Sequence, residues 1–395
     1  MAKLHPISRF LGRRHARYLA LGSAIGAAGA GAGKLRTVNR DPSVDPVSAA
    51  VSGVVAERVD ELGIRVPRFG AGLHTSDWDL PNIEHARVDY WVDRFVTVPE
   101  MHERMEGFLE RSGRYASLIS EKLAERRMPQ DLIFLAMIES GFQTSATSSA
   151  SAVGIWQFIP ETGRRYGLRI DRAVDERRDP ERATEAALDY LGELHERFGS
   201  WYLAAAAYNT GENRVGRLMR ERFGKERANG EMSYYQIWDA LPRETRDYVP
   251  LMIAAARIAK DPEAHGFGDV VPDGPEVYDE VLAERGITLE ALARQGEVPL
   301  EALQDLNPQL LRGRTPDDGP YTLRVPVGTA PRVAEALDHV ARDHPIRIAT
   351  HTVRSGETLT HIAQRYGTSV SVLRRTNRLR GDRLVTGQTL EVPMD

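Results

Sequence analysis

The stretch MPQDLIFLAMIESGF, residues 128–142, decides the fold of this chain. Pro129 suits the first turn of a helix, and Gly141 suits the cap at its C-terminus. Almost every residue from Leu132 to Ile138 is apolar, and a helix that is apolar on all sides is a buried one. The stretch therefore predicts a helix in the interior of a helical domain.

One carboxylate, Glu139, continues the apolar face of this helix, because it follows Leu132 and Ala136 by seven and three residues. Burial and the C-terminal end of the helix dipole both favour the neutral acid, so we expect a raised pKa for Glu139. Such an acid keeps a proton that it can donate to a glycosidic oxygen near neutral pH. The helix alone leaves a second interpretation open, in which Glu139 turns outward at the helix end.

Helical patterns continue on both sides of this stretch. They predict helices over residues 98–127, 179–198, 201–208, 212–223 and 243–259, with Gly113 as a candidate break in the first. Residues 261–276 are rich in Pro, Gly and Asp and indicate a boundary. We therefore expect one helical domain over residues 98–262.

The first 32 residues have the pattern of an export signal. A basic start is followed at residues 18–32 by the small and apolar run YLALGSAIGAAGAGA, which offers small-residue cleavage sites. A flexible leader without a targeting role is the alternative. Residues 33–97 are expected to form a partly disordered N-terminal segment, because Pro, Gly and Asp are frequent in most of it.

Composition excludes several classes of function. The 395 residues predict two or three domains, and the net charge of −4 gives no reason to expect nucleic acid as a partner. The chain has no cysteine, which excludes disulfides, thiolate metal sites and a lipid anchor on an N-terminal cysteine. The eleven His form no HExxH pair, and no nucleotide-binding glycine pattern precedes a helix, so we expect no metal and no cofactor.

The C-terminal third contains an internal repeat. Residues 287–307 align without a gap on residues 357–377, with identical pairs that include Leu289/Leu359 and Asn307/Asn377. Similar strands, TLRVP and TLEVP, then end the two units at residues 322–326 and 389–393. The pattern predicts two small units over residues 277–327 and 350–394, each with two short helices framed by strands, joined by residues 327–349.

Three further motifs follow Glu139 along the chain. The run SSASAVGIWQFIP at 148–160 combines small residues with an amide, which suits close approach of a sugar chain and hydrogen bonds to its hydroxyls. Tyr208 and Asn209 in AAYNTGE at 206–212 are expected in a loop after an alanine-rich helix, and LPRETRDYVP at 241–250 carries Tyr248. Taken singly, these aromatic residues would be core residues and the amide a capping group.

Together and in this order, ES at 139–140, GIWQFIP at 154–160, AAYNTGE at 206–212 and ETRDYVP at 244–250 resemble the lytic transglycosylases of glycoside hydrolase family 23, and most closely the membrane-bound lytic transglycosylase D group. The resemblance implies a mostly α, lysozyme-like catalytic domain with Glu139 as the catalytic acid/base. The substrate-binding residues that it implies are Ser148, Gly154, Gln157, Phe158, Tyr208, Asn209 and Tyr248, and Tyr248 also helps to hold Glu139.

The family's reaction needs a single carboxylate. Ordinary glycosidases use two, whereas here the 6-hydroxyl of N-acetylmuramic acid (MurNAc) replaces water and leaves a 1,6-anhydro end. Asp175, Glu176 and Asp179 are expected to cap a helix and pair with arginines, and Glu212 is expected to start the next helix. Two alternatives stay open: a muramidase that uses water, and a wall-binding scaffold without catalysis.

Residues 351–394 resemble a LysM module, through VRSGETL at 353–359, IAQRYG at 362–367, TNRL at 376–379 and GQTLEVP at 387–393. LysM modules are small α+β (βααβ) folds that bind glycans containing N-acetylglucosamine (GlcNAc). The implied glycan-binding positions are Ser355, Gly356, Glu357, Thr358, Leu359, Asn377, Arg378 and Leu379. The earlier unit has Arg285-Gly286-Ile287 in place of this loop and is interpreted as a degenerate LysM-like unit.

The sequence as a whole predicts an exported enzyme of the periplasm or cell envelope whose partner is the peptidoglycan glycan strand. Membrane attachment is expected only if the leader is retained. The mode of cleavage, the preference for peptide stems and the oligomeric state are left open.

Overall fold

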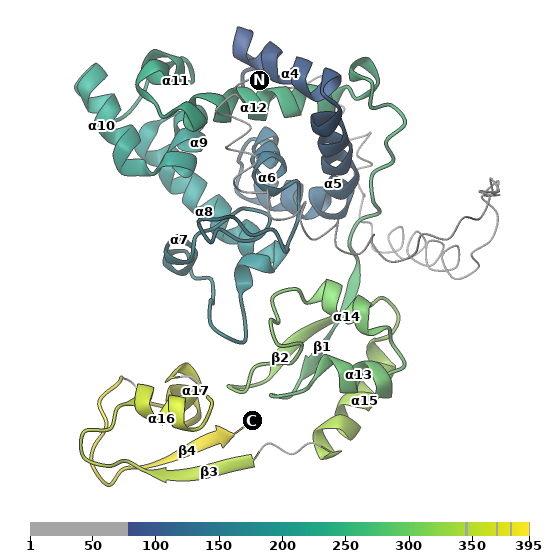
Figure 1. Ribbon diagram of the computed structural model, residues 1–395, viewed down its shortest axis with the longest axis vertical. Coiled ribbons are helices and arrows are strands. Elements are labelled where there is room, and N and C mark those ends of the chain that lie inside the picture. The colour runs from purple at the N-terminus through teal and green to yellow at the C-terminus, as the bar shows by residue number, and fades with distance from the viewer. Residues whose placement is uncertain (1–77, 344–346, 369, 380, 395) are drawn as a thin grey trace, which may run out of the picture. The chain divides into compact units, whose positions relative to one another are not determined.

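The computed structural model describes residues 78–343, 347–368, 370–379 and 381–394 and divides the chain into two compact units (Figure 1). The first comprises the described residues up to 276 apart from 171–175, which belong with residues 277 onward in the second. The export signal predicted over residues 1–32 lies outside the described residues, as does most of the segment 33–97.

The first unit is helical. Its α-helices are α4 (Ala86–Thr97), α5 (Pro99–Glu125), α6 (Ile133–Ser140), α7 (Pro160–Arg165), α8 (Pro180–Phe198), α9 (Trp201–Thr210), α10 (Glu212–Phe223), α11 (Met232–Ile237) and α12 (Arg243–Lys260). Short 3₁₀ turns precede α6 and α8 at Gln130–Leu132 and Glu176–Arg178, and others follow α11 and α12 at Trp238–Ala240 and Glu263–His265.

Helix α6 lies in the core of this unit, and every one of its residues is buried. It packs against α5 and α12 (Figure 1). Gly141 ends it in a left-handed conformation, at φ 60°, and a Cβ atom there would lie 2.2 Å from the ring of Phe108. The prediction of a buried helix capped by Gly141 is confirmed.

Two features near α5 differ from the sequence predictions. Helix α5 runs through Gly113 without a break, because the glycine admits the returning chain: a Cβ atom there would lie 2.0 Å from the carbonyl oxygen of Asp273. Helix α4 precedes the expected start of the domain at residue 98, yet it buries Val88, Trp91 and Phe95 in the same core. Their spacing of three and four residues forms one apolar face, which the mixed composition of the segment hides.

A buried carboxylate connects α4 to α12. Asp247 accepts hydrogen bonds from Nη2 of Arg87 at 3.0 Å and from Nε1 of Trp91 at 3.3 Å. Because a buried carboxylate is costly unless it is paired, these bonds fix the N-terminal part of α12 against α4. Tyr248 follows Asp247 directly.

The second unit contains the two predicted repeats. In the first, β1 (Tyr278–Ala283) pairs antiparallel with β2 (Tyr321–Pro326) around α13 (Leu289–Gln295) and α14 (Leu300–Leu306). In the second, β3 (Arg347–Thr352) pairs antiparallel with β4 (Thr389–Met394) around α16 (Leu359–Arg365) and α17 (Val370–Thr376). Two short helices framed by strands are confirmed in both repeats.

The identical asparagines of the repeat make the same three hydrogen bonds. Nδ2 of Asn307 donates to the carbonyl oxygens of Leu303 and Arg324, and its Oδ1 accepts from the Arg324 backbone N–H. Asn377 bonds in the same way to Leu373 and Glu391. Each asparagine therefore joins the second helix of its repeat to the last strand.

The first repeat is larger than the sequence predicts. Residues 327–349 were expected to connect the repeats, but α15 (Ala330–Asp343) buries Val333, Ala336 and Leu337 in the core of the first repeat. Val174 is fully buried in the same core and forms an antiparallel bridge with Leu310. These apolar additions enlarge a small core.

A mostly helical unit followed by two small α+β repeats confirms the predicted fold class. Within the described part of the chain, no helix is both long and apolar enough to span a bilayer.

Candidate active site

The centre of the candidate site is a hydrogen bond between α6 and α12. The hydroxyl of Tyr248 donates to Oε1 of Glu139 at 2.6 Å. The Glu139 residue is only 6% exposed and Tyr248 only 1%. The carboxyl group thus turns into the protein, and the interpretation in which Glu139 turns outward is wrong.

A proline shapes the helix turn that carries Tyr248. Pro250 lies inside α12 and has no N–H, so the carbonyl oxygen of Arg246 loses its helical partner. Nε1 of Trp238 donates to this oxygen at 2.7 Å and the hydroxyl of Tyr234 at 2.9 Å. The freed carbonyl is thereby satisfied, and α12 stays continuous through Tyr248.

The segment between α6 and α7 folds into tight turns. The side-chain oxygen of Ser148 accepts from the backbone N–H groups of Ala150 and Ala152 at 3.2 and 3.0 Å. Gly154 has φ 84°, and a Cβ atom there would lie 1.7 Å from the carbonyl oxygen of Arg177. Only glycine fits this close approach of two backbones.

Gln157 is buried in these turns, with φ 50° and 7% of its surface exposed. Its Nε2 donates to the carbonyl oxygens of Gly154 and Ala146 at 2.9 and 3.3 Å. Among the described residues, no donor is bonded to its Oε1. Gln157 therefore has one buried acceptor atom that the described residues leave unused.

Four hydrogen bonds join the four motifs into a closed ring. They run from Ser140 Oγ to the Ile155 carbonyl (2.9 Å), from the Tyr208 hydroxyl to the Trp156 carbonyl (2.8 Å), from Thr245 Oγ1 to Asn209 Oδ1 (2.9 Å) and from the Tyr248 hydroxyl to Glu139 Oε1 (2.6 Å). Within each motif the bonded residues are adjacent or three apart. The ring fixes the four motifs around Glu139.

Aromatic packing extends from Tyr208. Its ring lies 6.1 Å from that of Phe158 and 5.2 Å from that of Tyr190, measured between centroids. The hydroxyl of Tyr190 donates to Oε2 of Glu212, the first residue of α10, at 3.1 Å. This packing holds the end of α9 that carries Tyr208.

The predicted substrate-binding residues divide into two groups. Gln157, Tyr208, Asn209 and Tyr248 share the hydrogen-bonded turns and helix ends around Glu139. Ser148, Gly154 and Phe158 are buried, and the contacts described above place them as supports of the turns.

The predicted loop position of Tyr208 and Asn209 is wrong. Both lie in the last turn of α9, which continues to Thr210 because the N–H of Gly211 bonds to the carbonyl oxygen of Ala207. The sequence patterns also gave no indication of Ser140 and Thr245 as members of the ring. Both residues lie in motifs that were identified through their neighbours, Glu139 and Tyr248. The position of a hydroxyl group in the sequence does not indicate which distant residue it will bond to.

Two carboxylates of the charged run before α8 are bonded within their own segment. Asp179 caps α8 by accepting from the backbone of Glu181 and Arg182, and Glu176 accepts from the backbone N–H of Arg169 at 2.7 Å. Within the described ranges, no cluster of three or more His, Asp or Glu side chains is arranged to hold a metal ion.

The LysM positions are largely engaged within their own repeat. Oε2 of Glu357 accepts from the backbone N–H of Arg354 and from Nε2 of His351, both at 2.8 Å, and these bonds lower the pKa of Glu357 to about 2. Thr358 caps α16, and Leu359 is buried in the core of the repeat.

The remaining LysM positions differ in whether they contact the rest of the repeat. The side chain of Asn377 joins α17 to β4, and Leu379 packs partly buried on the core of the repeat. Gly356 and Arg378 both have positive φ, at 80° and 53°. Ser355, Gly356 and Arg378 are exposed and lie outside the core of the repeat.

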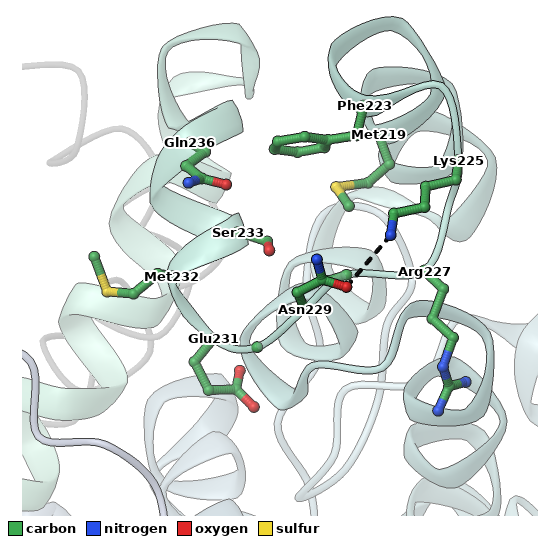
Figure 2. Close-up of a pocket in the computed structure, with 11 residues that line it drawn as sticks. Met219, Phe223, Lys225, Arg227, Asn229, Glu231, Met232, Ser233 and Gln236 are labelled. Carbon is green, nitrogen blue, oxygen red and sulfur yellow. Dashed lines mark hydrogen bonds between the residues drawn. The ribbon is translucent and has the colours of Figure 1, made fainter.

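A cavity of about 360 Å³ lies between α10 and α11 (Figure 2). Met219 and Phe223 face Ser233 and Gln236 across it. Glu231, which also lines it, accepts from the backbone N–H groups at the start of α9. The cavity is therefore near the N-terminus of α9, whereas Tyr208 lies in its last turn, and none of the predicted site residues lines it.

We expect Gly154→Ala to lower the free energy of unfolding by about 2–5 kcal/mol, because strain at positive φ adds to overpacking against Arg177. Chemical denaturation measures the effect. Gly167→Ala is the matched control, since Gly167 has the same φ of 84° but a Cβ atom there would meet no other atom within 4 Å, and it should cost about 1–2 kcal/mol. Equal losses in both variants would contradict the role of close packing at Gly154.

The chain matches three family models: the transglycosylase SLT domain over residues 117–230, the LysM domain over 351–393, and the LysM-like domain of lytic transglycosylase MltD over 277–342. Among solved structures, the 70 kDa soluble lytic transglycosylase of Escherichia coli is similar at 20% identity with a TM-score of 0.34, over 60% of this chain and 39% of that one. A score this low carries no weight for the fold.

Two curated relatives are more informative. The peptidoglycan transglycosylase gp16 of Escherichia phage T7 is 32% identical over 149 residues, which are 37% of this chain and 10% of that protein. The membrane-bound lytic murein transglycosylase D of Escherichia coli strain K12 is 34% identical over 316 residues, which are 76% of this chain and 69% of that protein. At this identity and coverage, the chain belongs to the lytic transglycosylase family that includes the membrane-bound lytic murein transglycosylase D.

Proposed function

We propose that this protein is a peptidoglycan lytic transglycosylase that cleaves the β-1,4 bond between MurNAc and GlcNAc and leaves a 1,6-anhydroMurNAc end. The observation that carries the proposal is the buried carboxyl of Glu139, held by Tyr248 inside a ring of four hydrogen-bonded motifs. A desolvated acid of this kind is suited to donate a proton and then to take one back.

In the proposed reaction, the Glu139 acid donates its proton to the glycosidic oxygen as the bond from that oxygen to C1 of MurNAc breaks. The Glu139 carboxylate then accepts the proton of the MurNAc 6-hydroxyl, whose oxygen bonds to C1 and closes the anhydro ring. No water is consumed, and the acid is restored. The substrate supplies the nucleophile, so a second carboxylate is not required.

Two polar atoms support recognition of a sugar chain beside Glu139. Oε1 of Gln157 and Nδ2 of Asn209 are buried and have no hydrogen-bond partner among the described residues. Together they offer one acceptor and one donor, which match the hydroxyl and acetamide groups of amino sugars. We assign both residues, with Tyr208 and Tyr248, to the glycan-binding site.

The LysM repeat over residues 350–394 is assigned to wall binding, through Ser355, Gly356, Arg378 and the backbone of the neighbouring positions. A second binding module raises the local concentration of the catalytic unit on an insoluble polymer. The proposed place of action is the periplasm or the cell envelope, which the leader pattern at residues 1–32 and the membrane-bound relative support.

We expect Glu139→Gln to lower the rate of glycan release from purified peptidoglycan by about 10²- to 10⁴-fold, because the amide still accepts the Tyr248 hydrogen bond but has no acidic proton. The matched control is Glu221→Gln on α10, an exposed residue paired with Arg217, which should leave the rate unchanged. Release by Glu139→Gln at the wild-type rate would reject catalysis by this carboxyl group.

Removal of residues 347–395, which comprise the whole second repeat, should weaken binding to sedimented peptidoglycan by about tenfold or more. Cleavage of short soluble glycan strands should persist, since the catalytic unit is intact. Co-sedimentation measures the first effect, and product release from soluble strands serves as the control. If the truncated protein bound sedimented peptidoglycan as strongly as the full-length protein, the second repeat would have no role in wall binding.

A further inference from the structure

Helix α5 carries two arginines on one flank that the proposed reaction does not use. Arg104 and Arg111 are seven residues apart, close to two helical turns, so they project from the same face. Both are half-buried, and burial lowers the pKa of each guanidinium group. A cation removed from water is costly unless an anion or a set of acceptors compensates it.

None of the described residues compensates the charge of Arg104. Its Nη1 is buried without a hydrogen-bond partner among the described residues. No ion pair with any described carboxylate involves it, and burial is the sole cause of its lowered pKa. Arg104 is therefore a partly desolvated cation to which no described carboxylate is bonded.

Arg111 connects this flank to the catalytic helix. Its Nε donates to the carbonyl oxygen of Gly141 at 2.7 Å, two residues after Glu139. Glu110 and Asp273 act on Arg111 electrostatically, but within the described residues neither forms a hydrogen bond or ion pair with it. Among the described residues, Arg111 is therefore hydrogen-bonded to a neutral carbonyl oxygen and not to a carboxylate.

Two glycines make room for the Arg111 guanidinium. A Cβ atom on Gly107 would lie 2.8 Å from Nη1 of Arg111, and one on Gly141 would lie 2.9 Å from Nη2. The group therefore lies between these glycines and is folded back along α5 toward the turn that carries Arg104. Both cations lie on one flank of α5, and a bound anion there would offset the cost of their partial burial.

We propose that Arg104 and Arg111 bind a carboxylate of the peptide stem on the MurNAc unit whose glycosidic bond is cleaved with Glu139 as the acid. The proposal rests on the proposed function, because that substrate carries stem peptides with free carboxylates next to the scissile bond. A planar guanidinium donates two parallel hydrogen bonds to a carboxylate, which gives direction as well as attraction. The site lies beside Gly141, at the end of the helix that carries Glu139, and would select strands that keep their stems.

The test compares soluble strands with intact stems and the same strands with amidated stem carboxyls, using the full-length protein. Arg104→Gln should raise KM for intact stems about tenfold at unchanged kcat, and should not change KM for amidated stems. For the wild type, amidation alone should raise KM by a similar factor, and combining it with Arg104→Gln should add nothing further. Arg217→Gln, on the exposed face of α10, is the matched control.

Thermal unfolding separates binding from a structural role. Removing an uncompensated charge should leave the midpoint of Arg104→Gln unchanged or raise it, whereas a structural role predicts a fall. An equal change in KM on intact and amidated stems, or none on intact stems, would overturn the carboxylate site. A wild-type protein that cleaves neither strand would instead overturn the proposed function, and this site with it.

Discussion

The hydrogen bond from Tyr248 to Glu139 is the interaction on which the rest of the catalytic unit depends. It joins two helices through residues that are 109 positions apart in the chain and fixes a carboxyl group away from solvent. Other features serve the same geometry. Gly141 ends α6 two residues after the acid, and the carbonyl left free by Pro250 is satisfied so that α12 continues through Tyr248. A single proton donor is useful only if its position is fixed this closely.

Local periodicity in the sequence predicts the helix that carries Glu139 and the side of it that is buried. The apolar stripe through Leu132 and Ala136 located Glu139 on a buried helix, because spacing along a helix reports which side faces the core. The partners of the acid are long-range and came from the family resemblance. The sequence predicts a loop at Asn209 because the residue follows an alanine-rich run, yet that helix continues to Thr210. The sequence does not single out Arg104 and Arg111, since only the folded chain reveals that neither is hydrogen-bonded to a carboxylate among the described residues.

The repeats show why identical residues need not be binding residues. Asn307 and Asn377 are identical because each joins a helix to a strand by the same three bonds. Leu359 and Thr358 likewise serve the core and a helix cap. Residues that recur between the two repeats therefore encode the fold, and any difference in ligand binding must arise from positions that the core leaves unused. The catalytic turns follow the same rule, with Gly154 and Phe158 as supports.

The central claim is that one buried carboxyl group moves a proton twice and that the sugar, not water, attacks C1. Mass spectrometry of the glycan ends released from purified peptidoglycan tests it most directly. The account predicts MurNAc ends that are about 18 Da lighter than reducing ends, since the mass of one water molecule is absent from an anhydro product. Reducing MurNAc ends as the primary product would contradict it, because they require water as the nucleophile.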